Sequence, residues 1–222
     1  MSHGTAVGDD GSSYTARACA VLVSALALTQ EPAPIKLPAP QKDGGKPLMQ
    51  ALALRATSRE FAPEPLPAQT VSNLLWAAWG INRPGEGKRT APSARNWQEI
   101  DLLAVDAKGA WRYDAAANTL EPLVPGDLRA LTGSQEFVKE APLTLVFVAD
   151  PARMKGADDA TRLPWAYADA AFLSQNVYLF CASEGLATGV RAMLDRPALA
   201  KAIGLGADRI IAFAQSVGFP RR

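Results

Sequence analysis

Two arginines and two hydroxyl side chains lie together in the short segment RATSREF. Arg55 and Arg59 flank Thr57, and a guanidinium presents forked donors that match the oxygens of a phosphate. Hydroxyls and free backbone N–H groups can complete the shell around such a dianion. The competing interpretation is a solvated helix end whose arginines pair with Glu60 or Glu64. The segment is therefore a candidate phosphate site, and its residue types alone leave both interpretations open.

A second group of polar side chains lies in the sequence PSARNWQ, at the end of a loop rich in glycine, proline and arginine. Asn96 and Gln98 each present a donor and an acceptor, which matches the carbonyl and N–H pattern of a pyrimidine-like ring. The competing interpretation is a turn in which Ser93 and Asn96 bond the local backbone. This motif therefore predicts a heterocycle site only in combination with others.

A third segment, EGLATGV at 184–190, consists mostly of small residues. Its glycines would let the backbone approach a flat ligand closely. The competing interpretation is a helix C-cap at Gly185 and an ordinary turn at Gly189. The segment is not a glycine-rich phosphate loop, because neither GxGxxG nor GxxxxGK[ST] occurs in the chain.

The composition excludes several classes of chemistry and of partner. The single histidine is His3, at the N-terminus, which argues against Ser-His-Asp and Cys-His nucleophile systems and against a histidine-ligated metal site. Cys19 lies in a segment expected to be removed, which leaves Cys181 as a lone thiol and excludes a disulfide framework. Lys and Arg total 23 against 22 for Asp and Glu, so no charge surplus favours nucleic acid or an anionic membrane surface.

Hydrophobic periodicity predicts an α/β (α+β) domain in which helices and strands interleave. Helices are expected at 47–55, 67–80, 128–131, 164–185 and 197–203. Strands are expected at 100–105, 111–114, 119–124, 143–149 and 210–217, with the second and third forming a hairpin. The strand at 143–149 is apolar throughout, which is typical of a central strand covered on both faces.

The N-terminal part of the chain predicts export. Residues 18–28 form an apolar run after Arg17, and the end of this run contains a possible small-residue cleavage site, Ala25-Leu26-Ala27. Residues 1–30 therefore resemble a secretory signal peptide. The run is too short to cross a bilayer, which needs about 20 residues. We expect a periplasmic or secreted protein, with a cytoplasmic protein as the alternative. Residues 31–46 read as a proline- and glycine-rich linker of poorly packed backbone, and residues 47–222 as one folded domain.

The order of the three segments resembles the FMN-dependent nitroreductase family. The family pattern R-x-[ST]-x-[RK]-x-F falls on 55–61, PSxxN falls on 92–96, and GLAT and a terminal VGFP follow in the same order. The resemblance extends over residues 47–220 and looks closest to members with an inserted hairpin, which include azoline-forming peptide dehydrogenases. It implies a homodimer whose mixed central sheet is flanked by helices.

The resemblance also implies which residues contact the flavin. The residues expected at the FMN phosphate are Arg55, Thr57, Arg59 and a C-terminal arginine, Arg221 or Arg222. Ser93 and Asn96 are expected to reach the flavin from the partner subunit or to line the substrate pocket. The backbone expected along the isoalloxazine ring is that of Ala187, Thr188, Gly189, Val190 and Arg191.

The activity implied by the resemblance is oxidoreduction between an electron donor and a small organic acceptor, nitroaromatic or quinone-like. The missing histidine agrees with this, because a flavin performs hydride and electron transfer itself and the protein supplies binding, orientation and electrostatics. No catalytic side chain is expected. The alternatives are a dehydrogenase of a peptide or small molecule, and a flavin-binding protein without turnover.

Overall fold

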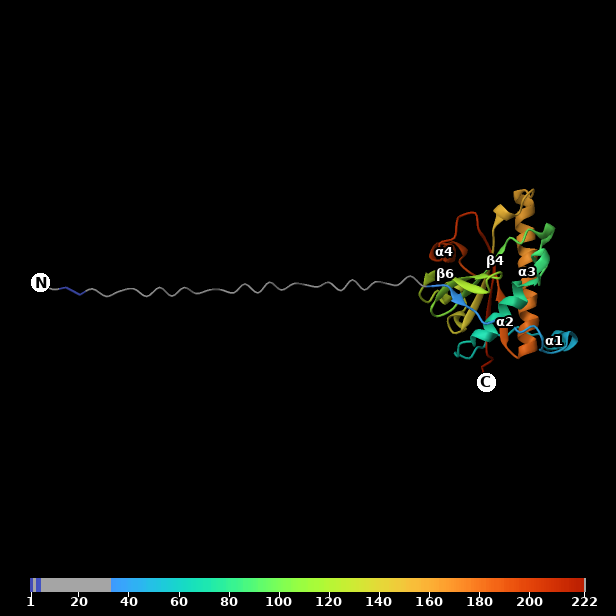
Figure 1. The fold of residues 1–222 in the computed structure, drawn as a ribbon, viewed down its shortest axis with the longest axis horizontal. Coiled ribbons are helices and arrows are strands. Elements are labelled where there is room, and N and C mark those ends of the chain that lie inside the picture. The colour runs from blue at the N-terminus through green and yellow to red at the C-terminus, as the bar shows by residue number, and fades with distance from the viewer. Residues whose placement is uncertain (2, 5–32, 222) are drawn as a thin grey trace. The chain divides into compact units, whose positions relative to one another are not determined.

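The computed structural model describes residues 1, 3–4 and 33–221 (Figure 1). The signal peptide expected at residues 1–30 lies, apart from three of its terminal residues, outside the described residues. Residues 33–221 form the folded unit.

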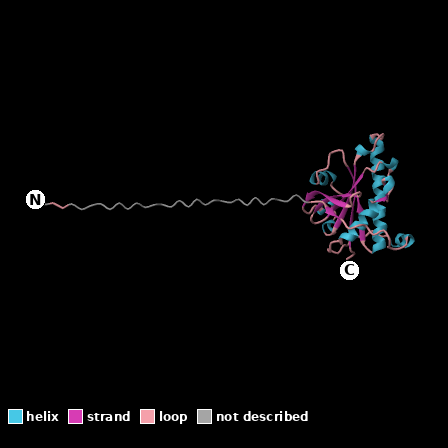
Figure 2. Ribbon diagram, viewed as in Figure 1, coloured by secondary structure: helices cyan, strands magenta, loops and turns pink. Residues whose placement is uncertain are grey.

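A β-sheet forms the centre of the domain (Figure 2). It has seven strands, in the order β1-β6-β5-β4-β7-β9-β8. Its strands are β1 (Ile35–Lys36), β4 (Ile100–Val105), β5 (Gly109–Asp114), β6 (Thr119–Pro125), β7 (Leu143–Ala149), β8 (Ala187–Arg191) and β9 (Ile210–Gly218). Every pairing in this sheet is antiparallel. The family resemblance implies a mixed sheet, so this detail of the expectation is corrected. The expected hairpin is the β5–β6 pair.

The strand β7 confirms the prediction of a central strand. It lies between β4 and β9, and all seven of its residues are buried. Leu145 and Phe147 face one hydrophobic core, and Val146 and Val148 face the other. Both faces of this strand are therefore covered, which is why its sequence is apolar without alternation.

Helices cover both faces of the sheet, as the sequence predicts (Figure 1). The α-helices are α1 (Leu48–Leu54), α2 (Ala68–Trp79), α3 (Asp159–Glu184) and α4 (Arg196–Ala202). Buried side chains of α2 and α3 pack on one face, and Leu199 of α4 packs on the other. The helix expected at 128–131 is a 3-10 turn, Arg129–Thr132. A small separate hairpin consists of β2 (Ile81–Arg83) and β3 (Lys88–Arg89).

The long helix α3 begins earlier than expected. Its N-cap is Asp158, whose carboxylate accepts a hydrogen bond from the backbone N–H of Thr161. Pro164, the expected start, lies inside the helix near its N-terminal end. The end is as predicted: Gly185 has a left-handed φ of 72° and its N–H donates to the carbonyl of Cys181.

Residues 33–46 differ from the poorly packed linker expected from their composition. β1 pairs with β6 at the edge of the sheet, and Leu37 is buried. The carbonyl of Pro38 accepts hydrogen bonds from Ser72 and Asn118. Proline lacks only the N–H, so a proline-rich segment can lie along an edge strand and still satisfy its carbonyls. The part of the segment around Leu37 and Pro38 therefore belongs to the packed domain, whereas residues 41–46 are exposed.

Candidate functional site

The structure brings the first and third motifs together at the edge of the sheet. β8 is the last strand, and the backbone N–H of Ser58 donates to the carbonyl of Thr188 over 2.8 Å. Gly189 lies within β8, so the turn considered for it is wrong. A Cβ at Gly189 would lie 2.8 Å from the carbonyl oxygen of Ser58. The glycine is thus needed for two backbone segments to approach each other rather than for a ligand to approach the strand.

The predicted phosphate-binding arginines have no partners of their own. Arg55 and Arg59 form no ion pair and no side-chain hydrogen bond with any residue that the structure describes, Glu60 and Glu64 included. Both side chains are exposed, as is that of Thr57. The guanidinium of Arg55 lies over the ring of Tyr178, 5.3 Å from its centroid. Two cations beside a hydroxyl, without a carboxylate among their contacts, are a donor set that fits the phosphate of FMN.

Tyr178, which the sequence analysis missed, joins the two motifs. Its hydroxyl lies 2.9 Å from Thr57 Oγ1 and 3.1 Å from the backbone nitrogen of Val190, which donates to it. The side chain is 7% exposed. Thr57 and Tyr178 are separated by 121 positions in the chain, so no local pattern could have connected them.

The second motif lies elsewhere in the protomer. Ser93 Oγ accepts a hydrogen bond from the backbone N–H of Gln98, and the Gln98 side chain donates to Asn96 Oδ1. These side chains therefore bond within their own loop, as the competing interpretation expects. The N–H of Ala94 donates to Asp169 on α3. Asp169 and Tyr178 are nine positions apart on this helix, so the points where the two motifs contact α3 are roughly 13 Å apart along its axis. Within one protomer, the structure does not bring Ser93 and Asn96 to Arg55.

The same loop has an unusual backbone and a buried acid beneath it. Arg95, Asn96 and Gln98 adopt left-handed φ angles of 51°, 57° and 49°, which non-glycine residues rarely adopt. Glu99 is fully buried, and neither of its carboxylate oxygens has a hydrogen-bond partner among the described residues. Burial, followed by the neighbouring carboxyl of Asp169, raises the pKa of Glu99 to about 7. The loop therefore combines a strained backbone with an adjoining buried acid that is about half protonated at pH 7.

Arg191 and Arg221, which were also expected at the cofactor, are engaged within the protein, and the alternative Arg222 lies outside the described residues. The Arg191 guanidinium is buried and donates to the Thr132 carbonyl over 2.9 Å and to Ser216 Oγ over 2.9 Å. Burial lowers its pKa to about 10, so it stays charged at neutral pH. Arg221 lies beside the first motif, where its N–H donates to the Glu60 carbonyl, but its guanidinium pairs with Glu140 over 2.6 Å. Only the backbone of Arg191 is thus available along β8.

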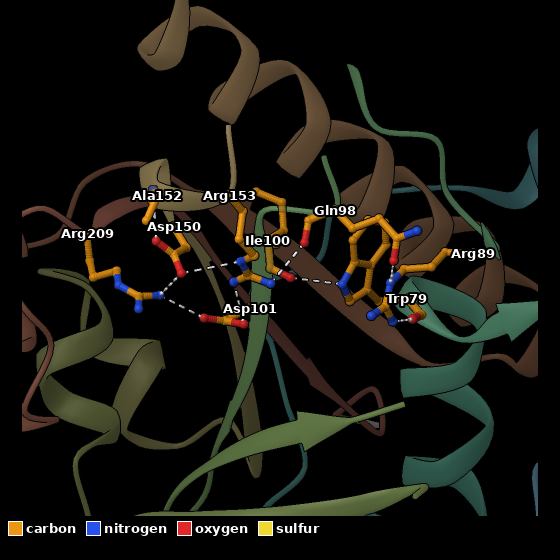
Figure 3. A network of polar contacts seen from close by, with 9 residues as sticks. All are labelled: Trp79, Arg89, Gln98, Ile100, Asp101, Asp150, Ala152, Arg153 and Arg209. Atoms are coloured by element: carbon orange, nitrogen blue, oxygen red, sulfur yellow. Dashed lines mark hydrogen bonds and ion pairs between the residues drawn. The ribbon is translucent and has the colours of Figure 1, made fainter. Parts of the chain in front are cut away.

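A second arginine cluster lies at the other end of β4 and β7 and is fully paired (Figure 3). Arg153 contacts Asp101 over 2.7 Å and Asp150 over 3.4 Å. Arg209 contacts the same two carboxylates over 3.0 and 3.1 Å. Arg153 also donates to the carbonyl of Gln98, at the end of the strained loop. Two arginines and two aspartates balance here, and the network ties the loop to the sheet.

The phosphate-binding candidates lie outside the larger cavities. Four cavities of about 300 to 680 Å³ are lined by other described residues, whereas Arg55, Thr57 and Arg59 are exposed at the surface. In the ranges that the structure describes, no cluster of three or more His, Cys, Asp or Glu side chains could hold a metal ion. None of the described helices has the length and apolar character needed to cross a membrane.

Comparisons with known proteins agree with the residue patterns. A model of the Nitroreductase family matches residues 52–219. The crystal structure of a putative nitroreductase from Ralstonia eutropha JMP134 is 41% identical with a TM-score of 0.82, and the match covers 86% of this chain and 91% of that one. A curated putative nitroreductase of Methanocaldococcus jannaschii is 26% identical over 152 residues, which are 64% of this chain and 76% of the relative.

A similar fold is also found in a more distant solved structure. A putative nitroreductase from Desulfovibrio desulfuricans, crystallised in complex with FMN, has a TM-score of 0.58 and 20% identity over 81% of this chain and 89% of that one. At this identity the likeness concerns the fold.

Proposed function

The chain belongs to the nitroreductase family, and we propose from this and from its phosphate-binding candidates that it is an FMN-dependent oxidoreductase acting on small organic molecules. The observation that supports the proposal most is the pair of exposed arginines, Arg55 and Arg59, which lack any partner among the described residues and flank Thr57. Cations left uncompensated by the fold are suited to a dianionic ligand. The FMN complex of the Desulfovibrio desulfuricans relative supports the choice of this flavin.

The residues of this chain would hold FMN by its phosphate and along the edge of the sheet. Arg55 and Arg59 would donate to phosphate oxygens, together with the hydroxyl of Thr57. The backbone of β8 would lie beside the flavin ring at the part of its outer edge that, among the described residues, neither a strand nor Ser58 nor Tyr178 contacts. Bound FMN supplies the hydride and electron transfer, so the protein needs no catalytic side chain of its own.

We propose further that the protein acts as a homodimer. On α1, the apolar side chains of Leu48, Met49, Leu52 and Leu54 are 43–74% exposed, and α3 exposes Trp165 and Phe172. An apolar surface of this kind is suited to a second copy of the chain. A partner subunit could bring its loop with Ser93 and Asn96 to the open surface around Arg55. Light scattering of flavin-loaded protein at micromolar concentration tests this, and a fully loaded monomer would contradict it.

We also propose that the protein is exported. An exported protein meets little cytosolic nicotinamide nucleotide, so its electrons would come from a quinol, a reduced protein or the organic substrate itself. N-terminal sequencing of protein from the native host and flavin reduction rates with NADH and NADPH test this together. An intact Met1 combined with fast, saturable reduction by either nucleotide would restore the cytoplasmic alternative.

Absorbance and turnover test the proposed function directly. Purified protein, mixed with FMN and passed over a desalting column, is expected to keep a yellow flavin spectrum. Steady-state assays with nitroaromatic and quinone acceptors then separate the proposed reductase from the alternatives. Flavin reduction by a peptide or small organic substrate, with transfer to oxygen or quinone, would indicate a dehydrogenase. Flavin binding without turnover in either direction would indicate a flavin-binding protein.

A further inference from the structure

Tyr178 contacts both segments that the proposed FMN site requires. It lies on α3, and its hydroxyl is within hydrogen-bond distance of Thr57 Oγ1 and of the Val190 nitrogen, at 2.9 and 3.1 Å. Its ring lies under the guanidinium of Arg55. The side chain is almost fully buried, so its orientation is fixed by packing rather than by solvent.

The direction of the hydrogen bonds in this group follows from the chemistry of the donors. The backbone N–H of Val190 can only donate, so the Tyr178 oxygen accepts from it. The proton of Tyr178 then needs an acceptor, and among the described residues Thr57 Oγ1 is the only one within hydrogen-bond distance. If Thr57 donated instead, the proton of a buried phenol would be left without a partner among the described residues, which is energetically costly. The order is therefore Val190 N–H to Tyr178 to Thr57.

This order determines what Thr57 can offer to a ligand. A hydroxyl that accepts from Tyr178 keeps its own proton for another contact. Thr57 is exposed on its far side, beside Arg55 and Arg59. The phosphate of FMN offers acceptor oxygens, so a hydroxyl that is held as a donor is matched to it before binding.

We propose that Tyr178 is a positioning residue of the phosphate site, an inference that rests on the proposed function. Its hydroxyl orients Thr57 as a donor toward the phosphate, and its ring holds the guanidinium of Arg55 beside that donor. Tyr178 itself does not touch the cofactor.

The test compares FMN with riboflavin, which has the same ring system and no phosphate. Tyr178→Phe keeps the ring under Arg55 and removes only the hydroxyl. It is expected to weaken FMN binding about 3- to 10-fold, the usual effect of losing one hydrogen bond, and to leave riboflavin binding unchanged. Tyr167→Phe is the matched control, because it makes the same change on the same helix, where Tyr167 packs against Phe213. Its affinities should equal those of the wild type.

A double-mutant cycle tests whether Tyr178 acts through Thr57. Thr57→Val removes the ligand-facing hydroxyl and is expected to weaken FMN binding about 10- to 100-fold. Tyr178→Phe added to Thr57→Val should then weaken it by less than about twofold more, because the oriented group is already gone. Fluorescence titration of apo protein with each flavin gives all of these affinities.

The titrations distinguish a failure of the proposed function from a failure of the positioning role of Tyr178. Wild-type protein that binds no FMN would overturn the proposed function and this inference with it. Wild-type binding of FMN with unchanged affinity in Tyr178→Phe would overturn the inference alone. Parallel losses for FMN and riboflavin, or full additivity with Thr57→Val, would show that Tyr178 supports the fold of the site rather than the phosphate donor.

Discussion

Two arginine clusters at opposite ends of the sheet differ in what their guanidinium groups meet. At one end, Arg153 and Arg209 share the carboxylates of Asp101 and Asp150 at 2.7–3.4 Å (Figure 3). At the other, the side chains of Arg55 and Arg59 meet no carboxylate among the described residues. The residue type is the same, but carboxylates neutralise the guanidinium groups in the first cluster and not in the second.

This difference separates a structural role from a binding role. A paired guanidinium gains its stabilisation from the fold and has little to offer a ligand. An unpaired one keeps all of its donors for a molecule that arrives later, and it contributes little to the stability of the empty protein. Arg191 is intermediate, because it is buried among neutral acceptors and remains charged. Substitutions in the unpaired cluster should therefore lower FMN affinity, and substitutions in the paired cluster should lower the free energy of unfolding.

The largest effect is expected from Arg55→Ala, measured as FMN affinity. Loss of one charge-assisted contact to the phosphate should weaken binding by about 1.5–3 kcal/mol, or roughly 10- to 150-fold. The melting temperature of the apo protein should change little, since among the described residues Arg55 loses only its contact with the ring of Tyr178. Arg112→Ala, at an exposed position of β5, is the control for a change of one charge. Unchanged FMN affinity in both Arg55→Ala and Arg59→Ala would remove the phosphate assignment.

Arg153→Ala should give the opposite result. Removing this guanidinium leaves two half-buried carboxylates with one cation and takes a donor from the Gln98 carbonyl. The free energy of unfolding is expected to fall by about 1–3 kcal/mol, with FMN affinity of the folded protein nearly unchanged. Arg162→Ala removes an ion pair with the exposed Asp159 and serves as the control. Comparable destabilisation by the two variants would contradict the structural role of the paired cluster.

Glu99 adds a dependence on pH to the region of the paired cluster. Its pKa in the fold, about 7, lies above its usual value of 4.5, so the folded protein holds the proton more tightly. This stabilisation is complete below pH 4.5 and is lost as the pH rises toward 7. Glu99→Gln mimics the protonated acid and should be more stable than wild type at pH 8, by about 1–2 kcal/mol, and equal to it near pH 4.

Urea titrations at several pH values give this comparison, with Glu64→Gln as an exposed control. A difference between Glu99→Gln and wild type that does not change with pH would show that folding does not shift the pKa of Glu99.

The smallest effect is expected from Arg221→Ala. The guanidinium lies near the phosphate candidates but pairs with Glu140 at an exposed position. It would have to leave this partner to reach a phosphate, so its loss should weaken FMN binding by only about two- to threefold. Glu140→Gln frees the arginine and should strengthen binding slightly. A loss in Arg221→Ala as large as in Arg55→Ala would place Arg221 among the main phosphate contacts.

The sequence predicts those parts of the molecule whose signals are local. The strands at 100–105 and 143–149 and the end of α3 at Gly185 are confirmed, because periodicity and capping are properties of neighbouring residues. The strand β8 escaped prediction, since its composition resembles a turn and its structure depends on pairing with β9. β1 was hidden by prolines that an edge strand tolerates.

The candidate site also has features that the sequence predicts and features that depend on long-range contacts. RATSREF contains the arginines, and their chemistry is visible from their type and spacing. That they are unpaired, that Gly189 admits the Ser58 carbonyl and that Tyr178 orients Thr57 all depend on contacts between segments distant in the chain. Such contacts follow from the packing of α3 on the sheet, which no short pattern encodes.

The affinity ratio of FMN to riboflavin tests the central claim most directly, because the two ligands differ only in the phosphate. It should be measured by fluorescence titration of apo wild type and of the double variant Arg55→Ala/Arg59→Ala, with melting temperatures to confirm that both are folded. We expect wild type to prefer FMN by about 100-fold or more and the double variant to lose most of this preference. A ratio near one in wild type, or an undiminished ratio in the folded double variant, would contradict the account.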